Sequence, residues 1–307
     1  MKSKTISLTI YFFCFVFNII AQEKLTFPIR LCNNRIIIDY LHKNDTIHLI
    51  FDSGSTANLI DYNSSELLNI KSFNQNNYID YGINKLKTSI GETNDKVLFG
   101  KVWNVLDKNY YLKGICDFSG IVGVSNIFSK YVVEINFNDK EINFNTSKQI
   151  KPISNFTKKI KLNDPTIGNE TSATSYIKGL YSVTGNIKTN DTTIDKVQFL
   201  IDTGSQFEIA LILTDSSLIK KYSEGKKEYS SEFEGKKVVD YTTIKYCIDS
   251  TNYNFKSEVL MFYTKPSIFN IFGRSKVGVL LGTPYFSKYK SVIIDSFDRN
   301  LILYTYN

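Results

Sequence analysis

Two aspartates stand in nearly identical short motifs whose residue types could support acid–base chemistry. One motif is Asp52-Ser-Gly-Ser and the other is Asp202-Thr-Gly-Ser, 202 − 52 = 150 residues further on. Apolar residues precede and follow each motif, which is typical of a strand that ends in a tight turn. The Gly allows close backbone approach, and the hydroxyl groups can hold the turn and the carboxylate. One such motif is ordinary turn chemistry, whereas two indicate a duplicated half-domain.

The sequence downstream of each motif repeats as well. An apolar-apolar-Gly element ends at Gly123 and at Gly282, which lie 123 − 52 = 71 and 282 − 202 = 80 residues after the respective Asp. The tetrapeptide Phe-Ser-Lys-Tyr follows each element and precedes a pattern typical of a β-hairpin, at 132–144 and at 292–304. We interpret both glycines as structural, because they would let a strand cross beneath each Asp turn.

With these paired motifs, the chain resembles the pepsin-like and retropepsin-like aspartic proteases, in particular exported bacterial members with two fused lobes. The resemblance covers most of the chain after the N-terminal segment. It implies an all-β fold of two homologous β-barrel lobes, with the active-site cleft between them. It also implies an aspartic endopeptidase in which Asp52 and Asp202 meet at the lobe interface and share one activated water.

The resemblance assigns supporting roles to the residues that follow each Asp. These residues are Ser53, Gly54, Ser55, Thr203, Gly204 and Ser205. The hydroxyl residue next to each Asp would brace the facing loops through hydrogen bonds to the backbone. The second hydroxyl residue of each motif would hydrogen-bond the outer carboxylate oxygens. Two carboxylates that share a proton can then act as the acid and the base of peptide hydrolysis.

The resemblance also implies a flap that closes over the cleft. The candidate in the first lobe is the region 78–92, with a turn near Gly91, and Tyr81 is the candidate flap tyrosine. The counterpart in the second lobe is expected near Gly235.

Other chemistries find little support in the sequence. The only histidines are His42 and His48, and neither lies in a pattern of metal ligands or next to a nucleophile motif. No phosphate-binding loop is present. The net charge of +7 comes from scattered lysines, without the clustered basic surface of a nucleic-acid-binding protein. We expect no metal, no cofactor, no nucleic acid, and a peptide or protein as the substrate of a monomer.

Residues 1–21 read as a secretory signal peptide. Lys2 and Lys4 precede an apolar run, 6–20, and Ala21 supplies the small residue for cleavage. The alternative is a membrane anchor, but a run of about 15 residues is short for a span that needs roughly 20. We expect export to the periplasm or the extracellular space, without stable membrane insertion after cleavage.

The mature chain divides into a first lobe at 22–150 and a second lobe at 151–307. The segments between turns are rich in β-branched and aromatic residues, as expected of strands. Strands are predicted at 35–40, 97–105, 238–248 and 259–263, and short helices at 64–70 and 215–222. The three cysteines of the mature chain, Cys32, Cys116 and Cys247, are odd in number and indicate no disulfide framework. Cys116 and Cys247 are expected to pack as small buried apolar groups.

Two alternative functions stay open at this point. A binding module could keep the cleft and lose catalysis, although both Asp and all flanking hydroxyl groups are present. Actin-like sugar kinases and ATPases also use two Asp-x-Gly turns, in their case around phosphates and a metal. The export signal and the absence of alternating helical patterns argue against this second alternative.

Overall fold

The computed structural model describes most of the chain after the N-terminal segment. The described residues are 24–81, 84–94, 99–106, 116–124, 126–146, 157–163, 180–188, 193–213, 228–230, 237–248, 255–263 and 277–306, together with 215, 217 and 220. The predicted signal peptide and the predicted lobe boundary near residue 150 therefore lie outside the described residues, as does most of the predicted helix at 215–222.

The described residues are mostly in strands. The first half contains β1 (Lys24–Cys32), β2 (Arg35–His42), β3 (Asp45–Asp52), β4 (Leu59–Ile60), α2 (Tyr62–Leu67), β5 (Lys71–Tyr81), β6 (Asn84–Glu92), β7 (Val102–Leu106), β8 (Gly120–Gly123), β9 (Val132–Asn136) and β10 (Glu141–Asn145). The second half contains β11 (Thr157–Lys161), β12 (Ser182–Lys188), β13 (Thr193–Asp202), β14 (Ile209–Leu213), β15 (Glu228–Ser230), β16 (Lys237–Ile248), β17 (Phe255–Tyr263), β18 (Val277–Gly282), α4 (Thr283–Phe286), β19 (Ser291–Asp295) and β20 (Asn300–Tyr304).

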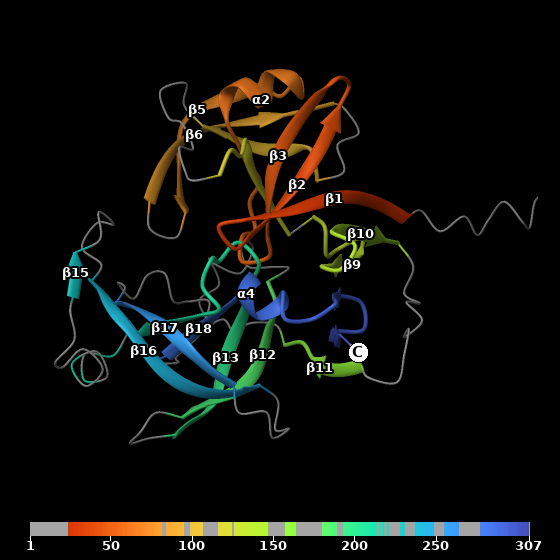
Figure 1. The fold of residues 1–307 in the computed structure, drawn as a ribbon. Coiled ribbons are helices and arrows are strands. Elements are labelled where there is room, and N and C mark those ends of the chain that lie inside the picture. The colour runs from red at the N-terminus through yellow and green to blue at the C-terminus, as the bar shows by residue number, and fades with distance from the viewer. Residues whose placement is uncertain are drawn as a thin grey trace, which may run out of the picture.

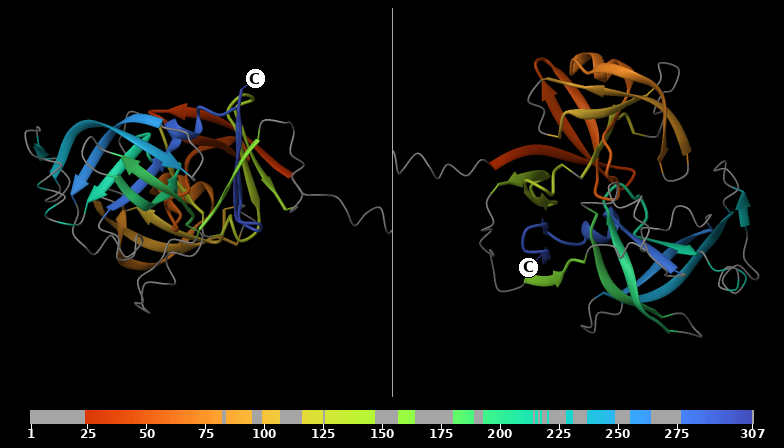
Figure 2. Two further views of the ribbon diagram at one scale, coloured as in Figure 1. Left: turned by 90° about the horizontal axis from the view of Figure 1, so that it is seen from below. Right: turned by 180° about the vertical axis from the view of Figure 1, so that it is seen from behind.

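These strands form two sheets. The larger has the order β11-β20-β19-β9-β10-β1-β2-β3-β8-β4-β7-β6-β5, and the smaller has the order β12-β13-β18-β14-β17-β16-β15, with an additional pairing of β12 with β16. Strands β2 to β6 lie on one side of the molecule and β12 to β18 on the other (Figure 1), and the view from behind shows the same two lobes (Figure 2).

The all-β, two-lobed prediction is confirmed, with one correction to the shape of the sheets. The described strands do not form two closed barrels, because the large sheet runs across both halves of the chain. The antiparallel pairing of β9 with β19 makes this junction, and Ile294 lies opposite Val133 there. The hairpins that end the two halves thus share one sheet, which ties the lobes together by backbone hydrogen bonds.

The repeated motifs adopt the same local topology in both halves. β3 runs parallel to β8 and places Asp52 opposite Gly123, whereas β13 runs parallel to β18 and places Asp202 opposite Gly282. The strand after each Asp turn pairs antiparallel with that same glycine-ending strand. In the first half β4 pairs with β8, and in the second half β14 pairs with β18. The duplication seen in the sequence is therefore a duplication of this three-stranded arrangement.

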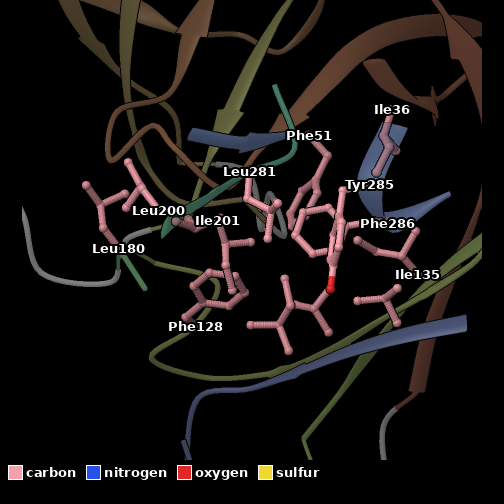
Figure 3. Close-up of a cluster of buried hydrophobic side chains, with 14 of the residues drawn as sticks. Ile36, Phe51, Phe128, Ile135, Leu180, Leu200, Ile201, Leu281, Tyr285 and Phe286 are labelled. Atoms are coloured by element: carbon pink, nitrogen blue, oxygen red, sulfur yellow. The ribbon is translucent and has the colours of Figure 1, made fainter. Parts of the chain in front are cut away.

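The core beneath the Asp turns combines residues of both halves. Phe51, Ile201 and Leu281 are nearly inaccessible to solvent. Figure 3 shows these side chains in one cluster with Tyr285 and Phe286 of α4. The strands that carry the turns are apolar and buried in the three residues before each Asp, 49–51 and 199–201, as expected for strand segments that are covered on both faces.

Most local predictions agree with the described elements. The helix predicted at 64–70 occurs as α2, which begins earlier because the Asp61 carboxylate accepts a hydrogen bond from the Ser64 N–H at 2.9 Å. The strand predicted at 97–105 begins only at Val102, where it follows the positive φ of Gly100 (115°). No helix in the described part of the chain is long and apolar enough to cross a membrane.

The interpretation of Cys116 as an unpaired apolar group is wrong, because it forms a disulfide with Cys32. The two Cα atoms lie 5.9 Å apart across a sequence separation of 84 residues. Cys32 ends β1, and the chain before β8 passes beside it. Long-range pairing of this kind depends on the tertiary fold, so the spacing of the cysteines gave no signal for it. Cys247 lies in β16, and its side chain is outside the described residues.

Reducing this disulfide is expected to lower the free energy of unfolding by about 2–4 kcal/mol, because it closes a long loop in the unfolded chain. Urea denaturation with and without reductant measures the change. A Cys32→Ser/Cys116→Ser variant is the control, and reductant should have no further effect on it. Equal stability of the oxidised, reduced and variant proteins would contradict this prediction.

Candidate active site

The two aspartates end equivalent strands and face each other between the halves. Asp52 is the last residue of β3 and Asp202 is the last residue of β13. A Cβ atom added to Gly54 would lie 2.6 Å from Cγ of Asp202, and one added to Gly204 would overlap the carboxyl group of Asp52. Each glycine therefore leaves room for the carboxyl group of the opposite motif, and the Asp202 carboxyl hydrogen-bonds the Asp52 side chain.

A reciprocal set of hydrogen bonds joins the two motifs. The backbone N–H of Ser53 donates to Oγ1 of Thr203, and the N–H of Thr203 donates to Oγ of Ser53, both at 2.9 Å. The Ser53 hydroxyl donates to the carbonyl of Ile201 at 2.9 Å, and the Thr203 hydroxyl donates to the carbonyl of Phe51 at 2.8 Å. Both hydroxyl residues are buried, so these four bonds are shielded from water and hold the two loops in one register.

Backbone N–H groups hold one oxygen of each carboxylate. Oδ1 of Asp52 accepts from the N–H of Gly54 at 2.9 Å. Oδ1 of Asp202 accepts from the N–H of Gly204 and of Ser205, both at 3.1 Å. Asp52 is buried and Asp202 is partly exposed. The carboxyl groups are therefore fixed from the side of their own loops.

Of the predicted hydrogen bonds from Ser55 and Ser205 to the carboxylates, only that of Ser205 is found among the described contacts, and its backbone N–H makes it instead of its hydroxyl group. The Ser55 hydroxyl donates to the carbonyl of Ala57 at 3.1 Å, and the Ser205 hydroxyl donates to the carbonyl of Phe207 at 3.4 Å. The Ser55 hydroxyl also accepts from the N–H of Ala57, and the Ser205 hydroxyl accepts from the N–H of Phe207, both at 3.3 Å. A serine can bond the backbone two residues ahead in this way, and here the bond closes the turn.

The environment of Asp202 favours its protonated form. Desolvation raises the pKa of Asp202 well above its ordinary value, and the charge and hydrogen bonding of Asp52 raise it further. The N–H groups of Gly204 and Ser205 lower this pKa but do not outweigh the other two effects. The pair can therefore hold one proton at a pH where an isolated Asp has lost it.

This raised pKa predicts how stability depends on pH. The folded protein keeps the Asp202 proton to a higher pH than the unfolded chain, whose Asp pKa is about 3.9. The contribution of Asp202 to the wild-type free energy of unfolding should therefore fall as the pH rises from about 4 through the folded pKa. Urea denaturation at several pH values should show that Asp202→Asn lacks this decline and exceeds the wild type in stability at neutral pH. An equal decline in both proteins would contradict the prediction.

Two buried side chains outside the motifs support the site. The Asn58 amide donates to the carbonyl of Phe99 at 2.8 Å and accepts from the N–H of Gly123 at 3.1 Å. The Thr283 hydroxyl donates to the carbonyl of Thr203 at 2.8 Å. Asn58 therefore ties the chain after the first Asp loop to β8. Thr283, which directly follows β18, ties that part of the chain to the second Asp loop.

Sequence reasoning missed both residues because they do not repeat between the halves. The position of Asn58 corresponds to Glu208, since 58 − 52 = 6 and 208 − 202 = 6. In the second half, the Glu208 backbone carbonyl accepts from the N–H of Gly282 at 3.0 Å, which replaces the side-chain bond. Thr283 directly follows its glycine, and the corresponding residue of the first half is Val124. The repeat therefore marks neither residue, and their contacts depend on the tertiary fold.

The candidate flap is the β5–β6 hairpin, but its turn is not near Gly91. The turn lies between Tyr81 and Asn84, which pair with each other. Gly91 pairs with Ser72 on one side and with Trp103 on the other, at the opposite end of the hairpin. The side chain of Tyr81 lies outside the described residues, so its flap role stays a prediction.

Close packing explains Gly91 better than a turn does. A Cβ atom added there would lie 2.5 Å from Cγ2 of Ile70. The second candidate flap position, Gly235, lies outside the described residues. Among the residues that the structure describes, no group of three or more His, Cys, Asp or Glu side chains could hold a metal ion.

The fold is that of the pepsin-like aspartic proteinases. An aspartic proteinase from Irpex lacteus superposes with a TM-score of 0.50 at 11% sequence identity, over 92% of this chain and 97% of that one. Basic 7S globulin from soybean superposes with a TM-score of 0.51 at 9% identity, over 93% and 96%. No protein-family model and no curated protein sequence matches the chain. These structural similarities define the fold, which a proteinase and a globulin share. The function must therefore be argued from the residues of the site.

Proposed function

We propose that this protein is an aspartic endopeptidase in which Asp52 and Asp202 activate a water molecule for peptide hydrolysis. The observation that carries the proposal is that hydrogen bonds join the two Asp loops and bring their carboxyl groups together. Two carboxyl groups in contact are held by N–H groups of their own loops and by a buried, reciprocal set of hydrogen bonds between the loops. Acid–base catalysis requires such positioning together with pKa values that differ between the two groups.

In the proposed reaction the two carboxyl groups exchange roles. The Asp52 carboxylate takes a proton from water, whose oxygen attacks the peptide carbonyl carbon, while protonated Asp202 gives its proton to the carbonyl oxygen. The tetrahedral diol then breaks its C–N bond. The leaving nitrogen receives the proton held by Asp52, and a diol hydroxyl returns a proton to Asp202. Asp202 serves as the initial acid because its environment favours the protonated form.

The proposal also includes the substrate class, the location and the monomeric state of the enzyme. The substrate is a peptide or protein outside the cytoplasm, and the enzyme acts as a monomer, because one chain carries both Asp loops. No metal or cofactor takes part in this mechanism. Cleavage of the signal peptide after Ala21 would leave Gln22 at the N-terminus. Mass spectrometry of the protein from its host tests this cleavage, and an intact segment 1–21 would contradict it.

A diverse peptide mixture tests the activity directly. Residues 22–307 are incubated with the mixture between about pH 3 and pH 8, and mass spectrometry identifies new peptide termini. The proposal expects cleavage at acidic to mildly acidic pH, and none by the isosteric Asp52→Asn control. The alternative is peptide binding without hydrolysis. We retain it because a globulin has a similar fold. Peptides retained by the wild type but left uncut at every pH would favour that alternative.

A further inference from the structure

The turn between β1 and β2 belongs to the first half of the chain but contacts the Asp loop of the second half. The amide of Asn33 donates to Oε1 of Gln206 at 2.7 Å, and the amide of Asn34 donates to the backbone carbonyl of Gln206 at 3.2 Å. The guanidinium Nε of Arg35 donates to the backbone carbonyl of Gly204 at 2.9 Å. Three consecutive residues thus contact the loop just after the second aspartate, and two of them, Asn34 and Arg35, bond its backbone.

The conformation of this turn is well defined. Cys32 pairs with Arg35, so Asn33 and Asn34 form a two-residue hairpin turn. Their φ angles are 47° and 60°, which is the left-handed region that this tight turn requires and that Asn tolerates. The turn therefore presents its side chains in a fixed direction.

A covalent link anchors the turn to the first half of the active site. The disulfide joins Cys32, at the end of β1, to Cys116, which lies just before β8. The chain then enters β8, which pairs with β3 and places Gly123 opposite the first aspartate. The turn that holds the second Asp loop is thus attached to the strand that supports the first.

The Arg35 contact acts on the peptide unit that faces the second carboxylate. The carbonyl of Gly204 and the N–H of Ser205 belong to one planar peptide group. Arg35 binds the carbonyl oxygen, and the N–H donates to Oδ1 of Asp202 at 3.1 Å. A charged donor on the carbonyl polarises the peptide group, which strengthens the hydrogen bond made by its N–H.

We propose that Arg35 is a positioning residue for the second catalytic aspartate, and that the Cys32–Cys116 disulfide keeps it in place. Arg35 fixes the Gly204–Ser205 peptide, and this peptide orients the carboxyl group of Asp202 toward Asp52. This inference rests on the proposed peptidase function for its kinetic consequences. The structural part, the order of the Gly204–Gln206 backbone, does not depend on activity.

Three variants test the proposal. Arg35→Met removes the donor and keeps the aliphatic stem. Arg35→Lys keeps a charged donor with a different geometry. The matched control is Arg30→Met, because the described contacts of Arg30, with Asp39 and Asp117, stay within the first half. The Cys32→Ser/Cys116→Ser variant tests the anchor separately.

The first readout is amide hydrogen exchange at Gly204 and Ser205, whose N–H groups are hydrogen-bonded to Asp202, and it needs no substrate. Exchange should be at least several-fold faster in Arg35→Met and in the double serine variant than in the wild type and in Arg30→Met. Unchanged protection in Arg35→Met would overturn the proposal, whatever the activity of the protein. If the wild type cleaves no peptide, the proposed function fails, and hydrogen exchange still decides whether Arg35 orders this loop.

The second readout is kinetic. In Arg35→Met, kcat should fall by about 10- to 100-fold with little change in KM, since small displacements of a catalytic group cost this much. The groups that act on Asp202 are Asp52 and the N–H groups of Gly204 and Ser205. Weakening the Ser205 hydrogen bond raises the pKa of Asp202 further, so the alkaline limb of the kcat profile should move to higher pH. Arg35→Lys should restore part of both effects. A fall in kcat without this movement would indicate a merely structural role and would overturn the assignment.

Discussion

Asp52→Asn and Asp202→Asn are each expected to reduce kcat for peptide cleavage by roughly 10²- to 10⁴-fold, the usual contribution of acid–base catalysis. The double variant should be little less active than either single variant, because the two groups act as one unit and their effects are not additive. The structural reason is the contact between the two carboxyl groups, which share one proton in the proposed mechanism. Initial rates on a peptide that the wild type cleaves measure the effect.

Two controls accompany these rate measurements. Activity per molecule should not change with protein concentration, because one chain holds both loops. Circular dichroism should show that the Asn variants are folded, since Asn has the shape of Asp. If either single variant kept most of the wild-type activity, the two carboxyl groups could not form the catalytic unit.

Thr203→Val is expected to destabilise the fold and to remove most of the activity, although it preserves the volume of the side chain. The hydroxyl accepts from the N–H of Ser53 and donates to the carbonyl of Phe51, and the site is inaccessible to solvent. Two buried backbone groups would lose a partner, at a cost of roughly 1–3 kcal/mol each. The free energy of unfolding should therefore fall by about 2–5 kcal/mol.

Thr203→Ser is the matched control because it keeps the hydroxyl group and removes only a methyl group. Its loss of stability should be about 1 kcal/mol, and its kcat should stay close to the wild-type value. Chemical denaturation and kinetics on the two variants give the comparison. Equal behaviour of the Val and Ser variants would show that the hydrogen bonds between the loops are unimportant.

The general fold was predictable because its signals are local and occur twice. Asp52 and Asp202 each follow an apolar strand, and Gly123 and Gly282 each end an apolar element at a similar distance. The structure gives both copies the same strand pairing. Repetition of a local pattern replaced the long-range information that a single sequence lacks.

The parts that could not be predicted depend on contacts between distant residues. The disulfide of Cys32 spans 84 residues, and the bond from Arg35 to Gly204 spans 169. No local pattern around these residues distinguishes them from surface turns. The turn assigned to Gly91 shows the converse error. A glycine that permits close packing against a neighbouring side chain has the same local signature as a glycine in a turn.

A carbon-13 NMR titration of the aspartate carboxyl groups tests most directly whether Asp52 and Asp202 form a coupled pair. The Cγ resonance of Asp202, assigned by its loss in Asp202→Asn, should keep its protonated shift well above the ordinary Asp pKa of about 3.9. In Asp52→Asn the midpoint for Asp202 should move to lower pH, because the neighbouring negative charge is gone. Titration of Asp202 near its ordinary pKa, both with and without Asp52, would contradict the shared-proton mechanism.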